Sequence, residues 1–366
     1  MKFDLKYKLI ILSIFIGVIP LIINSNLTYG FGKDSTEKQI LSQINSVADL
    51  KKDSLNKWFS GERDNLKIQS RDFELILFLN GESSSNFSYQ GILNRVDGFK
   101  ESHGHKRIFI TDKFGEVILS TEKKDVGEFS KESYVQSPLK SHNSYLGEVF
   151  NSPAGPVMFI SEPIFDFDFD KNVMINDVIG IFVMEVDVEK EIFYPLETWR
   201  GRGETGEVLV VRRDGEEVLF LNELKHKENA SLNFRIPLDS EFAKPAIFAS
   251  DGKEGILRTL DYRGEEVLAA YRNINLLNWG LVVKIDAVEA FQDVFILRDR
   301  VSFVGFVLLF IVIFFAIFSS ILVTRIERKR TDQLERFVKV TVGREKKMIE
   351  LKKEIQTLGG KNGKKK

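Results

Sequence analysis

The sequence predicts an α+β fold, in which a long N-terminal helix precedes two tandem antiparallel-sheet modules, all of it between two transmembrane helices. Three observations support this prediction. Apolar runs lie near both ends of the 366-residue chain, and a strand pattern occurs twice at an offset of 100 residues. Between the first apolar run and the first copy of that pattern, apolar residues recur at helical spacing.

Composition and charge describe a globular chain with unlike parts. Apolar residues make up 43% and charged residues 29% of the sequence, as is typical of folded proteins. The net charge is -1, but residues 324–366 carry 15 Lys and Arg against 6 Asp and Glu, so the centre of the chain is acidic. No cysteine is present, which excludes disulfides, thiolate metal sites and cysteine nucleophiles.

The run VSFVGFVLLFIVIFFAIFSSILV, residues 301–323, contains no charge. It is long enough to cross a bilayer core, which takes about 20 helical residues. A buried helix of a soluble core is the alternative, but such helices are seldom this long without a charge. The basic segment TRIERKR follows directly, and such segments mark the cytoplasmic side of a membrane. We therefore expect a transmembrane helix at 301–323 and a cytoplasmic tail at 324–366.

The shorter apolar run LIILSIFIGVIPLII, residues 9–23, follows three lysines in a predicted cytoplasmic N-terminus, residues 1–8. It fits either a cleaved signal peptide or an uncleaved anchor. The segment after it, NSNLTYGFG, lacks an A-x-A-like cleavage site, which favours the anchor. In both cases the basic flank stays inside. The sequence thus predicts a multi-pass protein of the inner (plasma) membrane whose residues 24–300 are extracytoplasmic.

The segment 31–100 is assigned to a long helix that precedes the first module. Apolar residues recur at spacings of three and four as far as about Leu79, with acids and lysines between them. GESSSNF, near Gly81, reads as a loop at the end of this helical stretch.

The centre of the chain contains two copies of one module. FITDKFGEVIL from Phe109 matches LVVRRDGEEVL from Leu209, and each reads as a hairpin with a Gly-containing turn. Two further pairs follow in the same order, PVMFISEPI with EVLAAYRNI and VIGIFVMEVDV with NWGLVVKIDAV, which places Gly180 opposite Gly280. We expect each copy to be a five-stranded antiparallel sheet with a short helix or loop between its second and third strands.

This plan of anchor, long helix, two PAS-like modules and second anchor resembles the double Cache (dCache) sensor domain of bacterial membrane receptors such as histidine kinases and chemoreceptors. The phrases that carry the resemblance are SYLGEVFNSPAGPVMFISEPIFD, GETGEVLVVRRDGEEVLF and EEVLAAYRNINLLNWGLVVKIDAVEAF. The resemblance implies that the distal module, residues 105–190, lies outside the membrane and binds a small molecule. It implies that the membrane-proximal module, residues 200–295, is more often structural.

The resemblance places the ligand between the sheet and the loop of the distal module, where the candidate side chains are Tyr134, Ser137, Tyr145 and Asp187. Tyrosines can supply an apolar wall with hydroxyls, and a carboxylate in a pocket suits an ammonium group. Tyrosines are also frequent in sheet cores, and Asp187 could instead cap the strand end. Family members that bind amino acids carry an Arg followed closely by Trp and Tyr on this loop. KESYVQS stands here instead, which puts an amino-acid ligand in doubt.

No metal, cofactor or catalytic site is predicted. His103 and His105 flank a glycine without further ligands at fixed spacing, so we interpret them as solvated loop residues. The sequence contains no Ser-His-Asp order, HExxH motif or phosphate loop. All four histidines precede the second apolar run, and the 43-residue tail is too short for an ATP-binding domain. We therefore expect no kinase, cyclase or hydrolase activity, and read the chain as either a stand-alone sensor or a shortened relative of a sensor histidine kinase.

The tail carries a heptad pattern. Its eight core positions, six of which are apolar, are Leu334, Phe337, Thr341, Arg344, Met348, Leu351, Ile355 and Leu358. This spacing of three and four predicts a parallel homodimer through a cytoplasmic coiled coil. A single amphipathic helix on an anionic membrane is the alternative, which the excess of Lys and Arg also suits.

Together these observations predict a signal-transduction sensor in the membrane, of the kind found in two-component systems. It binds a small extracytoplasmic ligand of unknown class in the distal module and relays the signal to a cytoplasmic partner protein. No nucleic-acid partner is expected. The alternative is a membrane-tethered ligand-binding or adaptor protein with no signalling output. An extracytoplasmic hydrolase has little support, because no catalytic set is present.

Overall fold

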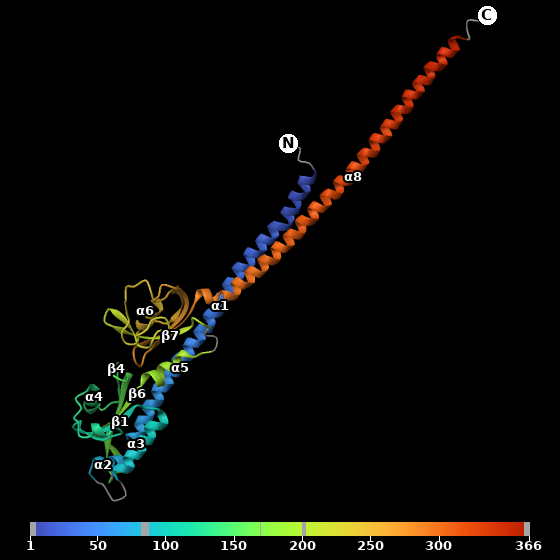
Figure 1. The fold of residues 1–366 in the computed structure, drawn as a ribbon. Coiled ribbons are helices and arrows are strands. Elements are labelled where there is room, and N and C mark those ends of the chain that lie inside the picture. Colours follow the sequence, from blue (N-terminus) through green and yellow to red (C-terminus); the bar gives the residue numbers. More distant parts are fainter. Residues whose placement is uncertain (1–4, 82–87, 169, 200–202, 362–366) are drawn as a thin grey trace. The chain divides into compact units, whose positions relative to one another are not determined.

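The computed structural model describes residues 5–81, 88–168, 170–199 and 203–361. The chain forms two compact units, one made of residues 34–292 and the other of residues 1–33 together with 293–366. The first unit holds both sheet modules, with α1 running along them (Figure 1).

The described residues between 5 and 103 form three helices: α1 (Leu5–Gln69), α2 (Phe73–Leu79) and α3 (Tyr89–His103). The Asp72 carboxylate begins α2 by accepting the N–H of Leu75 at 3.0 Å. Ser88 begins α3 in the same way, and Gly104 ends it in the left-handed conformation that glycine adopts at little cost. The long N-terminal helix is therefore present, but the predicted span 31–100 is divided among three helices, because these capping residues end one helix and begin the next.

The distal module is a six-stranded antiparallel sheet in the order β2-β1-β6-β5-β3, with β4 also paired to β5. Its strands are β1 (Arg107–Asp112), β2 (Val117–Ser120), β3 (Tyr145–Leu146), β4 (Phe150–Ser152), β5 (Gly155–Asp168) and β6 (Val173–Asp187). Between β2 and β3 lie η1 (Lys123–Asp125) and α4 (Ser133–Ser141). The segments η2 (Glu189–Phe193) and α5 (Tyr194–Glu197) lead to the next module.

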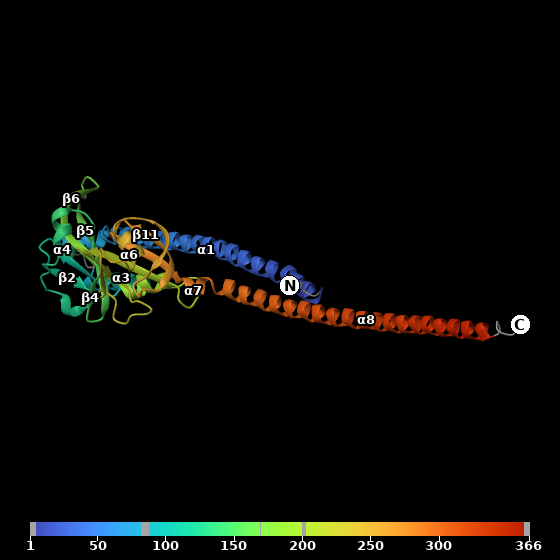
Figure 2. The same ribbon diagram turned by 90° about the horizontal axis from the view of Figure 1, so that it is seen from above.

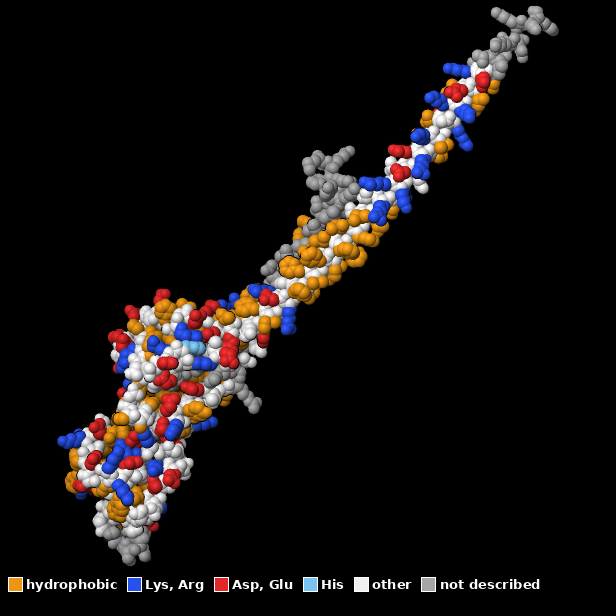
Figure 3. Space-filling view, in the orientation of Figure 1, with side chains coloured by type: hydrophobic (Ala, Val, Ile, Leu, Met, Phe, Trp, Pro, Cys, Tyr) orange, Lys and Arg blue, Asp and Glu red, His pale blue; other side chains and the backbone are white. Residues whose placement is uncertain are grey.

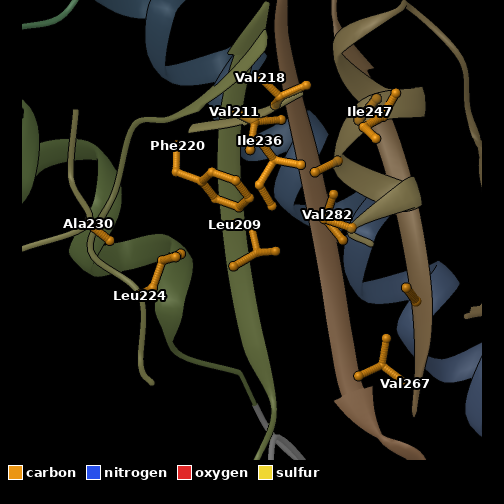
Figure 4. Packing of buried hydrophobic residues seen from close by; sticks show 14 residues of the cluster. Leu209, Val211, Val218, Phe220, Leu224, Ala230, Ile236, Ile247, Val267 and Val282 are labelled. Carbon is orange, nitrogen blue, oxygen red and sulfur yellow. The ribbon is translucent and has the colours of Figure 1, made fainter. Parts of the chain in front are cut away.

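The proximal module has the order β10-β11-β12-β7-β8-β9. Its strands are β7 (Glu207–Asp214), β8 (Glu217–Phe220), β9 (Arg235–Pro237), β10 (Gly255–Leu260), β11 (Glu266–Ile274) and β12 (Trp279–Asp286), with α6 (Lys244–Ser250) between β9 and β10 and α7 (Ala287–Ala290) after β12. Helix α6 covers one face of this sheet, where Ile247 packs with Val211 and Val282 in a hydrophobic core (Figure 4). Both modules have six strands rather than the predicted five, because two- and three-residue edge strands are too short to show an alternating pattern.

The predicted repeat is present in the central strands, where β1 pairs with β6 and β7 pairs with β12. Arg107 lies opposite Glu185 in the distal sheet, and Glu207 lies opposite Lys284 in the proximal sheet. The same position of the fold therefore carries a pair of opposite charges in both modules.

Gly180 and Gly280, which the sequence pairs, are not equivalent. A Cβ on Gly180 would lie 3.3 Å from the Leu79 side chain of α2, whereas one on Gly280 would lie 2.6 Å from the Ala249 Cβ of α6. The two glycines thus face opposite sides of their sheets. The predicted pairing of these two glycines is wrong by one residue, because a one-residue shift exchanges the faces of a strand.

Helix α1 packs on the sheet face opposite to α6. Its Phe59 ring meets Trp279 of β12 edge to face, with centroids 5.7 Å apart. Arg272 of β11 donates hydrogen bonds to Asp49 at 2.6 Å and to the Asn45 side chain at 2.7 Å. The buried stripe of α1 repeats at spacings of four and seven, as expected of an amphipathic helix: Ile44, Ala48, Leu55, Phe59 and Leu66.

The second unit consists of the N-terminal part of α1 and helix α8 (Gln292–Lys361), which continues past the N-terminal end of α1 (Figure 2). The Tyr29 and Phe295 rings stack with centroids 6.3 Å apart. Within the described residues, α8 is the one helix long and apolar enough to cross a membrane. Its exposed hydrophobic band, which gives way to Lys and Arg (Figure 3), contains the predicted span 301–323.

Residues 9–23, the first predicted transmembrane helix, are helical. Most of their side chains lie outside the described part of the structure. A second span at this position stays a prediction.

Candidate functional site

A cavity of about 320 Å³ opens between the distal sheet and the segment that follows β2. Strands β1 and β2 supply one side of it, and the segment from η1 to α4 supplies the other. Its lining residues are Arg107, Phe109, Val117, Asp125, Glu128, Phe129, Ser130, Lys131, Glu132 and Tyr134. Small-molecule sites have this size and combine apolar walls with a few polar groups, so this cavity is the candidate ligand site.

Arg107 supplies the most constrained charge of the cavity. Its Nε donates to Glu185 Oε2 at 2.8 Å, and its Nη1 donates to Asp125 Oδ2 at 3.1 Å. Burial alone would lower the pKa of Arg107, but the two carboxylates raise it, so the guanidinium stays charged. A ligand carboxylate would have to compete with both acids for this guanidinium.

Aromatic rings form the apolar wall. Tyr134 stacks on Phe159 with ring centroids 4.0 Å apart, and Phe109 meets Tyr134 edge to face at 6.2 Å. The Ser161 hydroxyl donates to the Tyr134 carbonyl at 2.5 Å, which fixes the start of α4 against β5. Burial raises the pKa of the Tyr134 phenol, and Glu132 adds to the rise. The phenol therefore stays protonated and can both donate and accept hydrogen bonds.

Carboxylates outnumber cations around the cavity. The acids are Asp125, Glu128, Glu132 and Glu185, and the bases are Arg107 and Lys131. Since two of the acids are engaged with Arg107, the exposed carboxylates of Glu128 and Glu132 remain to meet a ligand. The local potential therefore favours a ligand that carries positive charge.

The four predicted ligand residues fall in different places. Tyr134 lines the cavity. Ser137 lies half-buried further along α4 and Tyr145 lies half-buried on β3, and neither is in the cavity lining. Asp187 accepts the Lys190 N–H at 3.2 Å and thereby caps the turn after β6, which was the alternative interpretation of this residue. A contribution of these last three to ligand binding stays a prediction.

Sequence reasoning missed Arg107 and Asp125. Arg107 could have been noticed, because it aligns with Glu207 at an offset of 100 and each is a charged residue at the start of an apolar strand. Asp125 gave no such signal. Its role depends on Arg107 and on the Ser120 hydroxyl, which donates to it at 3.0 Å, and these partners are set by the fold.

His105 corrects another prediction, because its side chain is fully buried rather than solvated. Its Nδ1 lies 3.1 Å from Glu191 Oε2, and its Nε2 lies 3.2 Å from Glu62 Oε2. Burial alone would lower the pKa of His105, but its two carboxylate partners raise it to about 9. The imidazolium therefore joins α1, η2 and the start of the distal sheet.

In the proximal module, side chains fill the position that corresponds to the distal cavity. Lys284 Nζ lies 2.8 Å from both Glu207 Oε2 and Asp261 Oδ2. Tyr262 covers this group, since its hydroxyl donates to Glu207 at 3.2 Å and its ring centroid lies 5.0 Å from Lys284 Nζ. Phe220 packs against the Tyr262 ring in turn. Aromatic side chains therefore occupy the position that corresponds to the distal cavity.

Two similar sheet modules on one long helix, with a cavity in the first, define a ligand-sensing domain. The family model described as Cache domain, dCache_1, matches residues 32–294, and the chain belongs to this family. Cache domains are extracytoplasmic sensors of membrane receptors.

Solved structures of such sensor domains share the fold. The sensory domain of the Campylobacter jejuni chemoreceptor Tlp3 with isoleucine bound aligns with a TM-score of 0.51 and 12% identity, over 71% of this chain and 98% of that one. The ligand-binding domain of the same chemoreceptor with 4-methylisoleucine gives 0.50 and 12%, over 71% and 96%. The extracellular domain assigned to the histidine kinase mmHK1S-Z2 gives 0.48 and 12%, over 70% and 99%. At this identity the likeness to the two Tlp3 structures establishes the fold alone. No curated protein sequence matches the chain.

Proposed function

We propose that the chain is a membrane receptor that binds a small ligand in the distal cavity, outside the cytoplasm, and relays binding to a cytoplasmic partner protein. The observation that carries the proposal is the distal cavity, in which a constrained arginine and an aromatic wall surround about 320 Å³ of open space. The corresponding place in the proximal module is filled, which supports one ligand per distal module.

The charges around the cavity support a ligand with an ammonium group and an apolar part. Glu128 and Glu132 can hold the ammonium, and the face of Tyr134 can add a cation–π contact. Tlp3 binds isoleucine, a ligand with both an ammonium and a carboxylate. In this chain Arg107 is already neutralised by two acids. The protein therefore recognises the ligand mainly through its ammonium group.

Thermal unfolding of the full-length protein in detergent tests the cavity. Isopentylamine, isovaleramide and isovalerate share an apolar part but differ in charge. We expect the amine to raise the unfolding temperature, because a ligand that binds only the folded state stabilises it, and we expect isovalerate to have no effect. Tyr134→Ala and Glu132→Gln should remove the response, whereas Tyr194→Ala, at an exposed tyrosine outside the lining, should keep it. An unchanged response in Tyr134→Ala would refute the assignment.

We also propose two transmembrane helices, at 9–23 and 301–323, with residues 1–8 and 324–366 in the cytoplasm. The apolar band of α8 and the basic segment after it support the second helix and its orientation. Alkaline phosphatase fused after residue 150 should be active, and a fusion after residue 340 should be inactive. The opposite pattern would contradict this topology.

We propose that the tail is a parallel dimer that contacts the partner and has no enzymatic activity of its own. Its core positions are exposed in the single chain, as they must be to meet a second copy: Leu334, Phe337, Met348, Leu351 and Ile355. Cysteines at Met348 should cross-link across the pair, and cysteines at Lys346 should not. A ligand response that survives deletion of 331–366 would favour the tethered adaptor instead.

A further inference from the structure

A second depression, with a volume of about 890 Å³, lies where the distal and proximal modules meet. The end of β7, the turn after α6 and the turn between β11 and β12 line it. The distal module contributes Glu148, from the segment between β3 and β4. It shares no lining residue with the distal cavity, so a ligand in one site does not block the other.

One ion pair of this depression joins the two modules. Arg212 of β7 donates from Nη1 to Glu148 Oε2 at 2.8 Å. The Arg212 side chain is 17% exposed, whereas the Glu148 side chain is 78% exposed. Water and salt compete for an exposed carboxylate, so such a pair contributes little stability. Glu148 is therefore the partner that can leave, and Arg212 is a largely buried cation that needs an anion.

The other charges of the depression already have partners. Arg213 and Lys253 lie 3.0 and 3.6 Å from the Asp251 carboxylate. The lining as a whole has three cations against two carboxylates. An incoming anion therefore meets a net positive site, in which Arg212 has the most easily displaced partner.

We propose that this depression is a second binding site, which takes a small organic carboxylate in place of the Glu148 side chain on Arg212. A guanidinium presents two parallel N–H groups that match a carboxylate, and the hydrogen bond to Glu148 uses one terminal nitrogen of this fork. The exposed amides of Asn275 and Asn278, which line the same depression, are placed to bond polar groups on the rest of the ligand.

Occupancy of this site releases a contact between the modules. The segment that carries Glu148 continues into β4, where Phe150 stacks on Phe159 with centroids 5.8 Å apart. Phe159 also stacks on Tyr134, in the wall of the distal cavity. A carboxylate on Arg212 therefore alters binding in the distal cavity, and the effect is reciprocal. This coupling rests on the proposed function, whereas binding at Arg212 does not.

Calorimetric titration of the full-length protein with malonate tests the site, with malonamide as an uncharged probe of similar shape. We expect malonate to bind and malonamide not to bind. Arg212→Gln should weaken malonate binding about tenfold or more, since a charged hydrogen bond is lost, and Arg212→Lys should also weaken it because the fork is absent. Glu148→Gln should tighten binding about two- to five-fold by removing the internal competitor. Arg235→Gln, another arginine paired with an exposed carboxylate, should bind malonate like the unmodified protein.

Equal binding of malonamide, or unchanged malonate affinity in both Arg212 variants, would overturn the proposal. So would the absence of malonate binding in both the unmodified protein and Glu148→Gln. Tyr134→Ala separates the two proposals, because it should remove the response to the distal ligand and leave malonate affinity unaltered. Loss of malonate binding in Tyr134→Ala would assign the anion to the distal cavity and overturn the second site.

Discussion

The distal and proximal sheets each carry a salt bridge at the same position, but the acid and the base are exchanged between the two strands. In the distal module the base is Arg107 on β1 and the acid is Glu185 on β6. In the proximal module the acid is Glu207 on β7 and the base is Lys284 on β12. A third residue, an acid in each case, completes both groups. The electrostatic arrangement is thus shared, and it does not decide which module has a cavity.

The residues that cover the salt bridge determine which module has a cavity. Tyr262, from the turn between β10 and β11, lies over Lys284, which is 1% exposed. Tyr134, from α4, stands beside the distal salt bridge and stacks on Phe159 instead, which leaves Arg107 24% exposed. A cavity in this fold is therefore controlled by the placement of one aromatic side chain, and the same charges serve stability where they are covered and binding where they are open.

Removal of the base from each salt bridge should show the largest difference in stability between the two modules. Lys284→Met leaves the buried Glu207 without its cation and leaves Asp261 with Arg263 alone, and we expect a loss of about 3 to 5 kcal/mol in the free energy of unfolding. Arg107→Met should cost less, because the Arg107 side chain is 24% exposed against 1% for Lys284, and water in the cavity can take the place of the guanidinium. Urea denaturation of the full-length protein measures both, with the exposed Lys253→Met as a near-neutral control. Equal losses of unfolding free energy for Lys284→Met and Arg107→Met would contradict this difference between the modules.

The attachments to α1 should respond to pH in opposite directions. His105 holds α1 at the distal end through Glu62. Its folded pKa of about 9 exceeds the ordinary histidine value of 6.5, so its stabilisation is complete below pH 6.5 and is lost as the pH rises through 9. The shift corresponds to about 3 kcal/mol. Hydrogen exchange should show α1 losing protection around Glu62 between pH 7 and 10, and His105→Gln should flatten this dependence.

At the proximal end, Arg272 binds α1 through Asp49. The hydrogen bond to Arg272 lowers the pKa of Asp49 below 3.8. Its contribution is therefore present above pH 3.8 and is lost as the pH falls through the lowered value. Protection around Asp49 should persist at pH 10. Simultaneous loss at both ends would show that α1 is released as one piece.

The smallest expected effect comes from the tyrosine hydroxyls. Tyr262→Phe removes the hydroxyl donor to the buried Glu207 carboxylate and should cost about 1 to 2 kcal/mol of unfolding free energy. Tyr134→Phe should change it by less than about 0.5 kcal/mol, because water in the cavity can replace that hydroxyl. Thermal unfolding of the two variants checks this difference, and a larger loss for Tyr134→Phe would reverse the assignment of open and closed modules.

The central strands could be predicted from the sequence because their apolar patterns are local and occur twice. The edge strands could not, since β3 contains two residues and β9 three. The burial of His105 could not be predicted from the sequence either. Its partners Glu62 and Glu191 lie 43 and 86 residues away along the chain, and each looks like an ordinary surface acid in its own segment. Tyr134 was found because the resemblance to sensor domains pointed to its loop, whereas Arg107 needed the register between β1 and β6.

The contacts of α1 also set an order of events during synthesis. Asn45 and Arg272 lie 227 residues apart, and the Phe59 ring must wait for Trp279. The chain therefore emerges with an apolar stripe that has no cover until almost the whole of the proximal sheet has been made. The distal sheet, which ends at Asp187, can close first and shield the part of α1 around Glu62. Closing such long loops is slow, so the remaining stripe is the part of the nascent chain that most needs a chaperone.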